Sequence, residues 1–175
     1  MITKDNNLKI MEIFYKEPNR ASHIRELARE TGLSSTGVIK IVKRLKKEGL
    51  LKSKKEKMVD EIRASLSSRF YMMKRLYNIF SLYECGIIEE IKNRYEEPDA
   101  IVLFGSYEKG TDTDKSDIDI CVISRKETQL NTEKFARKLK RAVNIITLDI
   151  DKATDEFRNS IANGTILEGY AELIR

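Results

Sequence analysis

Residues 101–124, IVLFGSYEKGTDTDKSDIDICVIS, decide the fold that we expect for the C-terminal half of this chain of 175 residues. The apolar residues 101–104 end at a Gly-Ser pair, and after ten further residues an Asp-Ile-Asp triplet opens a second apolar run at 120–123. Short apolar runs bounded by a glycine turn and by charged residues are typical of buried strands. The stretch therefore predicts a strand, a tight turn, a loop and a second strand.

Two features of this stretch are suited to a nucleotide. Gly105 lets the backbone turn sharply, and Ser106 offers a hydroxyl at the start of a short helical segment whose N–H groups are suited to a triphosphate. Asp117 and Asp119 lie two residues apart in a strand, so both carboxylates emerge on one face while Ile118 turns into the core. Two hard oxygen ligands side by side favour Mg²⁺.

The segments LFGS and SDIDICVI, taken together, resemble the signature of the nucleotidyltransferase superfamily, a Gly-Ser pair followed by Asp-x-Asp on the next strand. The resemblance covers about residues 98–175, and their small number is similar to the minimal nucleotidyltransferases. It implies that Gly105 and Ser106 hold the triphosphate and that Asp117 and Asp119 bind Mg²⁺. In that family a hydroxyl attacks the α-phosphate of a nucleoside triphosphate, with ATP the nucleotide favoured here, and pyrophosphate leaves.

The third position of the implied catalytic set holds an amide. Active members of the family usually place a third carboxylate on the next core strand, and the matching stretch here, residues 143–146, has Asn144. A neutral amide can coordinate a cation but adds no negative charge and is a poor general base. Asp149 has the opposite strand parity and Asp151 suits the cap of the following helix, so neither replaces it. We therefore expect nucleotide and Mg²⁺ binding with weak or absent turnover.

The N-terminal part of the chain is basic. Residues 1–70 carry a net charge of +8, whereas residues 98–175 carry −2. This asymmetry indicates two domains with different partners, the first a polyanion.

Three helices are expected in this basic part. The first covers residues 6–16, the second follows a Ser22 cap and ends at a glycine turn, and the third begins at residue 34 or 35 and ends at Glu48. The single histidine, His23, is expected on a helix surface or at a helix start, without a role in a site.

The second and third of these helices form a helix-turn-helix pattern. The third is apolar on one face and basic on the other, and residues 50–52 and 59–66 predict a β-hairpin after it. Residues 5–68 therefore resemble winged-helix DNA-binding domains, and a helical bundle that docks a protein is the alternative. The residues expected to contact double-stranded DNA are Ser35, Thr36, Lys40, Lys43, Arg44, Lys47, Lys54, Lys55 and Lys57.

Residues 69–97 connect the two parts. Apolar and aromatic residues recur there at helical spacing, which predicts one or two helices with a break at Gly86. Their side chains are expected to pack in the core or to form a dimer contact. A homodimer suits a winged helix that binds a two-fold operator.

Strands alternate with helices after Pro98. A strand is expected at 143–150, a helix at 154–162 and a short last strand at 166–167. The fold class is a two-domain α+β or α/β protein. It has a winged helix at 1–68, connecting helices at 69–97 and a nucleotidyltransferase-fold mixed sheet with flanking helices at 98–175.

Composition narrows the function further. Cys85 and Cys121 lack the spacing of a zinc site and are expected as reduced core thiols. No apolar run reaches the roughly 18 residues of a membrane span, so we expect a cytoplasmic protein without a membrane partner. Two functions follow. The first is a DNA-binding regulator that binds a nucleoside triphosphate, and the second is an enzyme that moves a nucleotide to a protein or RNA hydroxyl, as in toxin-antitoxin pairs.

Overall fold

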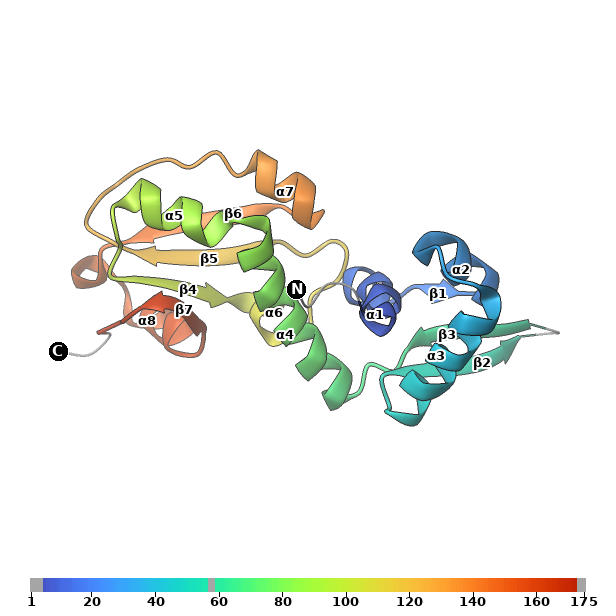
Figure 1. Ribbon diagram of the computed structural model, residues 1–175. Coiled ribbons are helices and arrows are strands. Elements are labelled where there is room, and N and C mark those ends of the chain that lie inside the picture. Colours follow the sequence, from blue (N-terminus) through green and yellow to red (C-terminus); the bar gives the residue numbers. More distant parts are fainter. Residues whose placement is uncertain (1–4, 57–58, 173–175) are drawn as a thin grey trace. The chain divides into compact units, whose positions relative to one another are not determined.

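The computed structural model describes residues 5–56 and 59–172, and the chain divides into two compact units, residues 1–74 and 75–175 (Figure 1). In the described part of the chain, no helix is both long enough and apolar enough to cross a membrane. Lys57, one of the predicted DNA contacts, lies outside the described residues.

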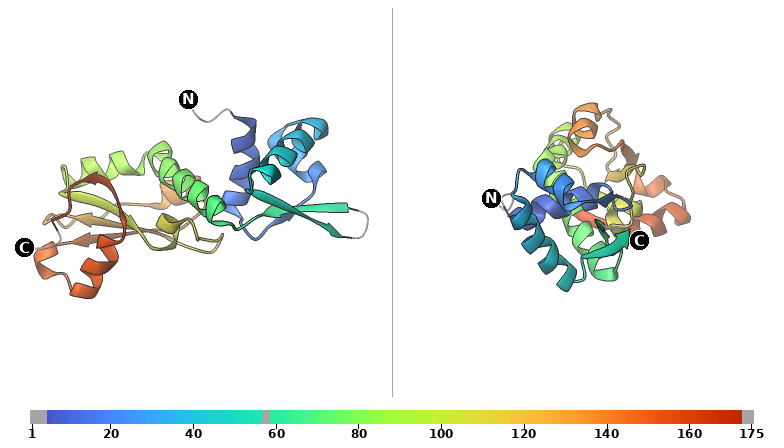
Figure 2. Two further views of the ribbon diagram at one scale, coloured as in Figure 1. Left: turned by 90° about the horizontal axis from the view of Figure 1, so that it is seen from below. Right: turned by 90° about the vertical axis from the view of Figure 1, so that its right-hand side faces the viewer.

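The first unit contains three helices and a small antiparallel sheet. Its strands are ordered β1-β3-β2, and the β2–β3 hairpin can be followed in Figure 2. The predicted helices and hairpin are present, whereas the two-residue strand β1 was not predicted from the sequence. The elements are α1 (Asn6–Lys16), β1 (Ala21–Ser22), α2 (Ile24–Thr31), α3 (Ser35–Lys47), β2 (Leu51–Glu56) and β3 (Val59–Ala64).

The expected Ser22 cap is wrong by one residue. Ser22 is buried and pairs with Ile62 in the β1–β3 ladder, so His23 occupies the N-cap position of α2. The backbone N–H of His23 donates to the Glu26 carboxylate at 2.9 Å, which satisfies one backbone donor at the helix start. At the other end Gly32 adopts the left-handed conformation, with φ of 70°, as the glycine turn predicted.

A continuous helix follows the hairpin. Helix α4 (Ser68–Cys85) spans the boundary between the two units, and α5 (Ile87–Tyr95) begins after Gly86, whose φ of 85° makes the predicted break. The apolar residues of these helices are divided between core and surface. Leu82 and Ile87 are fully buried, while Leu76 is 56% exposed.

The second unit is built on a four-stranded mixed sheet. Its order is β6-β5-β4-β7, with β4 antiparallel to both neighbours and β5 parallel to β6. The last strand is longer than the two residues expected, and β6 ends two residues earlier than expected. The remaining elements are β4 (Ala100–Phe104), α6 (Gly105–Lys109), β5 (Ile118–Ile123), α7 (Glu133–Leu139), β6 (Val143–Leu148), a 3₁₀ turn η2 (Ile150–Lys152), α8 (Asp155–Ala162) and β7 (Thr165–Gly169).

Helices cover both faces of this sheet (Figure 1). Ile101 and Leu103 of β4 pack with the α4, α5 and α7 side chains in one apolar cluster, while Val102 packs with Ile161 of α8 in a second. This alternation of inward positions on the two faces is the period-two pattern of a strand buried on both sides.

Both cysteines are free and buried, as the sequence predicted. Burial raises the pKa of the Cys121 thiol to about 12 and also raises that of Cys85. At neutral pH both are therefore protonated core side chains rather than nucleophiles.

Candidate functional site

The three polar residues predicted to form the centre of the site lie together at one edge of the sheet. Asp117 directly precedes β5, Asp119 lies within it, and the parallel register places Asp119 opposite Asn144 of β6. The Asn144 side-chain N–H₂ lies 3.1 Å from Asp119 Oδ1 and 3.3 Å from Asp117 Oδ2. The amide therefore donates between two carboxylates whose mutual repulsion it reduces.

The turn after β4 comes close to these carboxylates. Gly105 has a φ of +77°, and a Cβ added there would lie 2.9 Å from Asp119 Oδ2. Only glycine combines this left-handed backbone with the available space. The next residue, Ser106, is half-buried at the start of α6. The turn and the carboxylates thus form one surface.

No basic side chain of the described residues neutralises this pair of carboxylates. Asp117 is exposed and Asp119 half-buried, and within the described part of the chain the amide of Asn144 is the partner of both. Two carboxylates near one another and without a cation attract a divalent ion. Among the described residues, no group of three His, Cys, Asp or Glu side chains lies close enough to hold a metal.

Helix α3 presents the second predicted site. Val38, Val42 and Leu45 are buried on its inner face. Its outer face exposes all six residues that were expected to contact DNA: Ser35, Thr36, Lys40, Lys43, Arg44 and Lys47. The side chain of Ser34 caps the helix by accepting the Gly37 N–H at 3.2 Å.

Two cations of α3 are also used within the first unit. Arg44 donates to Asn7 of α1, and Lys46, which was not predicted as a site residue, donates to Ser53 of β2. Arg44 therefore links α3 to α1 in addition to facing solvent. Of the hairpin lysines, Lys54 is exposed, while Lys55 pairs with Asp60 through the strand backbone.

Comparison with protein families matches both units. Residues 87–170 match the family described as polymerase beta, nucleotidyltransferase, and residues 4–52 match winged helix-turn-helix DNA-binding domains. The chain joins a winged helix-turn-helix domain to a nucleotidyltransferase domain. Both resemblances identified from the sequence are confirmed.

Two solved structures are similar to part of the chain. One is a toxin-antitoxin crystal structure with AMP-PNP, at 28% identity and a TM-score of 0.39. The other is a mutant of the toxin-antitoxin MntA-HpeT, at 27% identity and a TM-score of 0.40. Each match covers 48% of this chain and 71% of the other chain. No curated protein matched.

The residues of the nucleotidyltransferase domain fit a single divalent cation. The two carboxylates supply hard oxygen ligands on one face, and rotation of the Asn144 amide would turn its oxygen toward the same point. The carboxylates of Asp117 and Asp119 carry a total charge of −2, which balances the charge of one Mg²⁺ but not of two.

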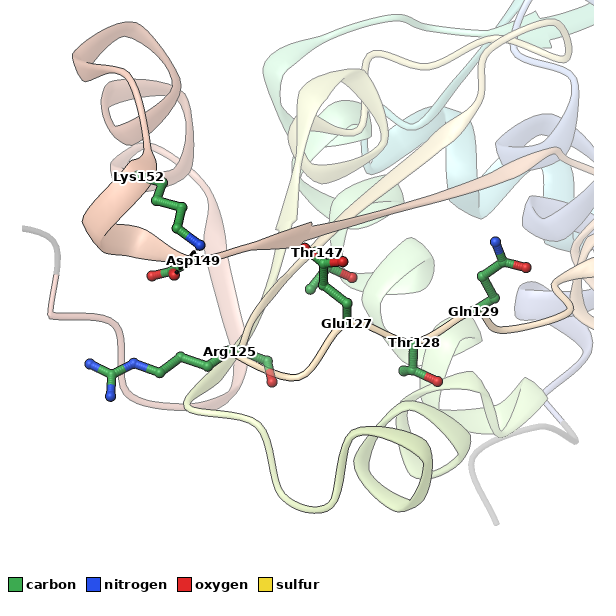
Figure 3. A pocket seen from close by; sticks show the side chains of 8 residues that line it. Arg125, Glu127, Thr128, Gln129, Thr147, Asp149 and Lys152 are labelled. Carbon is green, nitrogen blue, oxygen red and sulfur yellow. Dashed lines mark ion pairs between the residues drawn. The ribbon is translucent and has the colours of Figure 1, made fainter.

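A pocket at the C-terminal end of β5 and β6 is separate from the site formed by Asp117, Asp119 and Asn144. It has a volume of about 550 Å³ and lies where β5 and β6 end (Figure 3). Some of its polar groups are bonded within the protein: Lys152 pairs with Asp149 at 3.2 Å, and the Thr147 hydroxyl lies 2.6 Å from that of Tyr95. In Figure 3 the Arg125 side chain extends away from the other side chains drawn.

A Gly105→Ala substitution tests the close approach of the turn to Asp119. The left-handed backbone should cost about 1–2 kcal/mol of stability in urea unfolding, because a side chain disfavours this conformation. The added methyl should also move the flexible Asp119 carboxylate away from Asn144. We expect a shift of the Asn144 side-chain amide signals in a two-dimensional NMR spectrum.

Gly86→Ala is the matched control. Gly86 has a similar φ of 85°, but no atom lies within 4 Å of the place its Cβ would take. It should lose comparable stability and leave the Asn144 signals in place. If the Asn144 side-chain signals are the same in both variants, the contact between the Gly105 turn and Asp119 is contradicted.

Proposed function

We propose that the protein is a DNA-binding regulator whose nucleotidyltransferase domain binds a nucleoside triphosphate, with ATP favoured, together with Mg²⁺, and turns it over weakly or not at all. The uncompensated pair Asp117 and Asp119 supports the ligand, and the amide at the third position supports the low turnover. DNA and nucleoside triphosphates as partners imply a cytoplasmic location.

The position of Asn144 is the observation that carries this proposal. It lies directly opposite Asp119 in the β5–β6 ladder. The resemblance to nucleotidyltransferases implies a carboxylate at this position, since active members of that family usually have one. An amide cannot accept the proton of an attacking hydroxyl at neutral pH, whereas a carboxylate can. The chain therefore keeps two charged ligands but lacks the group best suited to act as a base.

The residues of the site have separate tasks in this proposal. The N–H groups of the Gly105–Ser106 turn and the Ser106 hydroxyl would bind phosphate oxygens, and the two aspartates would hold the cation. Bound Mg²⁺ supplies charge neutralisation for the phosphates. Because turnover is low in this proposal, the nucleotide stays bound as a ligand and is not consumed as a substrate.

Titration calorimetry tests the nucleotide site. The wild type is titrated with ATP, GTP, CTP and UTP in the presence of Mg²⁺, and again with EDTA. We expect heat of binding only with Mg²⁺, and a loss of about tenfold or more in affinity for Asp117→Asn and Asp119→Asn, since each removes one charged ligand.

Asp149→Asn is the control for this titration. Asp149 lies beyond the far end of β6 and should leave the affinity unchanged. The proposal fails if the wild type binds no nucleotide, or if the variants of Asp117 and Asp119 bind as the wild type does.

An active nucleotidyltransferase is the second candidate function. The close approach of the Gly105 turn to Asp119 supports this candidate, because a transferase needs a phosphate-binding turn beside its metal ligands. The acceptor would be a protein or RNA hydroxyl, and the oxygen of that hydroxyl would displace pyrophosphate from the α-phosphate. The proton then passes to water or to an aspartate, because Asn144 cannot take it.

Transfer of label from α-³²P ATP to candidate acceptors separates the two functions. The regulator predicts little or no transfer by the wild type, and an increase for Asn144→Asp, which restores the third carboxylate. Efficient transfer by the wild type that is lost in Ser106→Ala and Asp119→Asn would instead establish the enzyme.

The winged helix supports DNA as the partner of the first domain. Lys40, Lys43 and Lys47 lie on the exposed face of α3 and form no ion pair within the described residues. We further propose that the protein acts as a homodimer through the exposed apolar face of α4, where Met72 is 53% and Leu76 56% exposed. Two copies would match a two-fold DNA site.

Duplex binding measured over a range of salt concentrations tests the DNA contacts. Replacing Lys40 and Lys43 by alanine should lower the slope of log K against log salt by roughly 0.9 for each lysine, because each phosphate contact releases counterions. Lys9→Ala, an exposed lysine of α1, is the control. An unchanged slope for the double variant would overturn the claim, and a stoichiometry of two chains per duplex is expected for the dimer.

A further inference from the structure

A buried carboxylate lies in the loop that leads from the Gly-Ser turn to the aspartates. Asp112 is 1% exposed, although it belongs to a connecting segment between α6 and β5. A carboxylate in such surroundings requires partners, because its desolvation is costly. Its contacts link this loop to the connection between α7 and β6 and to helix α4.

The first partner is Arg141, in the connection between α7 and β6. Arg141 Nη2 lies 3.8 Å from Asp112 Oδ2, and the side chains are 6% and 1% exposed. The first residue of β5 is bonded to the same connection between α7 and β6, since the Ile118 N–H donates to the Ala142 carbonyl at 2.9 Å. This bond lies at the start of the β5–β6 pairing, where Ile118 is opposite Val143, and Asp112 lies six residues earlier in the chain.

The second partner is Asn78 of α4. Its side-chain N–H₂ donates at 2.8 Å to Asp112 Oδ1 and at 2.8 Å to the backbone carbonyl of Tyr107 in α6. Asn78 is 2% exposed, so these bonds are protected from water. This one amide ties the short helix after the Gly-Ser turn to the loop that contains Asp112.

We propose that Asp112 is a positioning residue of the nucleotide site, acting with Arg141 and Asn78 as a buried clamp. The clamp joins α4 to three segments that supply the site. Helix α6 begins with Gly105, the loop leads to Asp117, and the Arg141 connection leads to Asn144. The ligand is the nucleotide and Mg²⁺ of the proposed function, on which this inference rests.

The buried ion pair of Asp112 and Arg141 is better explained by positioning of the site than by a gain in the stability of the fold. A buried ion pair gains little stability over apolar side chains of similar volume, because desolvation offsets the attraction. It does favour one arrangement of its segments, since a displaced arrangement separates the buried carboxylate from the buried guanidinium. Here the favoured arrangement is the one with Asp119 opposite Asn144.

The variant Asp112→Asn tests the clamp in the full chain. It keeps the shape of the side chain and removes the charge that faces Arg141. We expect the affinity for ATP with Mg²⁺ to fall at least fivefold while the protein remains folded by circular dichroism. Ile161→Val, a buried change on the other face of the sheet, should lower the melting temperature and leave the affinity unchanged.

A second measurement needs no nucleotide. Hydrogen exchange of the Ile118 amide and the NMR signals of the Asn144 side chain report the start of the β5–β6 pairing directly. Asp112→Asn should speed exchange at Ile118 and shift the Asn144 signals, and Ile161→Val should do neither. Arg141→Gln should act as Asp112→Asn does, and the double variant should add little to either.

The outcomes separate this inference from the proposed function. Unchanged exchange and unchanged Asn144 signals in folded Asp112→Asn overturn the clamp, whatever the nucleotide titration shows. Altered signals establish its effect on the site's geometry even if the wild type binds no nucleotide, a result that overturns the proposed function alone. Nucleotide affinity within twofold of the wild type in this variant, with Asp119→Asn still impaired, also overturns the clamp.

Discussion

The parallel pairing of β5 with β6 is the constraint on which the candidate site depends. Along β5, Ile118, Ile120 and Val122 face one apolar cluster and Cys121 and Ile123 the other, so both faces are buried. A shift of the register by one residue would reverse the direction of every side chain relative to its neighbours on β6. Because the observed register places Asp119 opposite Asn144, core packing determines the chemistry at the edge of the sheet.

Two further contacts complete this arrangement. Gly105 lets the turn approach the Asp119 carboxylate, and the buried group of Asp112, Arg141 and Asn78 joins the segments around it. Neither contact involves much apolar surface. Both restrict geometry, which is what two carboxylates and a phosphate-binding turn require in order to share one ligand.

The first domain depends mainly on local patterns. Its helices were predicted correctly within a few residues, because apolar spacing, a serine cap and a glycine turn are all short-range signals. The strand β1 and the cap at His23 were not predicted, because a two-residue strand exists only through its pairing with β3 residues that lie 40 and 42 positions away in the sequence. The link from Arg44 to Asn7 has the same cause, a long-range contact that no local pattern contains.

The sequence by itself determined the two kinds of domain, the Gly-Ser turn, the pair of aspartates and the amide in place of a third carboxylate. These are properties of neighbouring residues and of strand periodicity, and they also carried the resemblance to nucleotidyltransferases. Only the tertiary structure decided that Asn144 donates to both aspartates and that Asp112 is buried against Arg141. These contacts join residues 25 to 29 positions apart, and they depend on which strands pair and in which register. Strand pairing is set by the packing of the whole domain, and a single segment does not contain it.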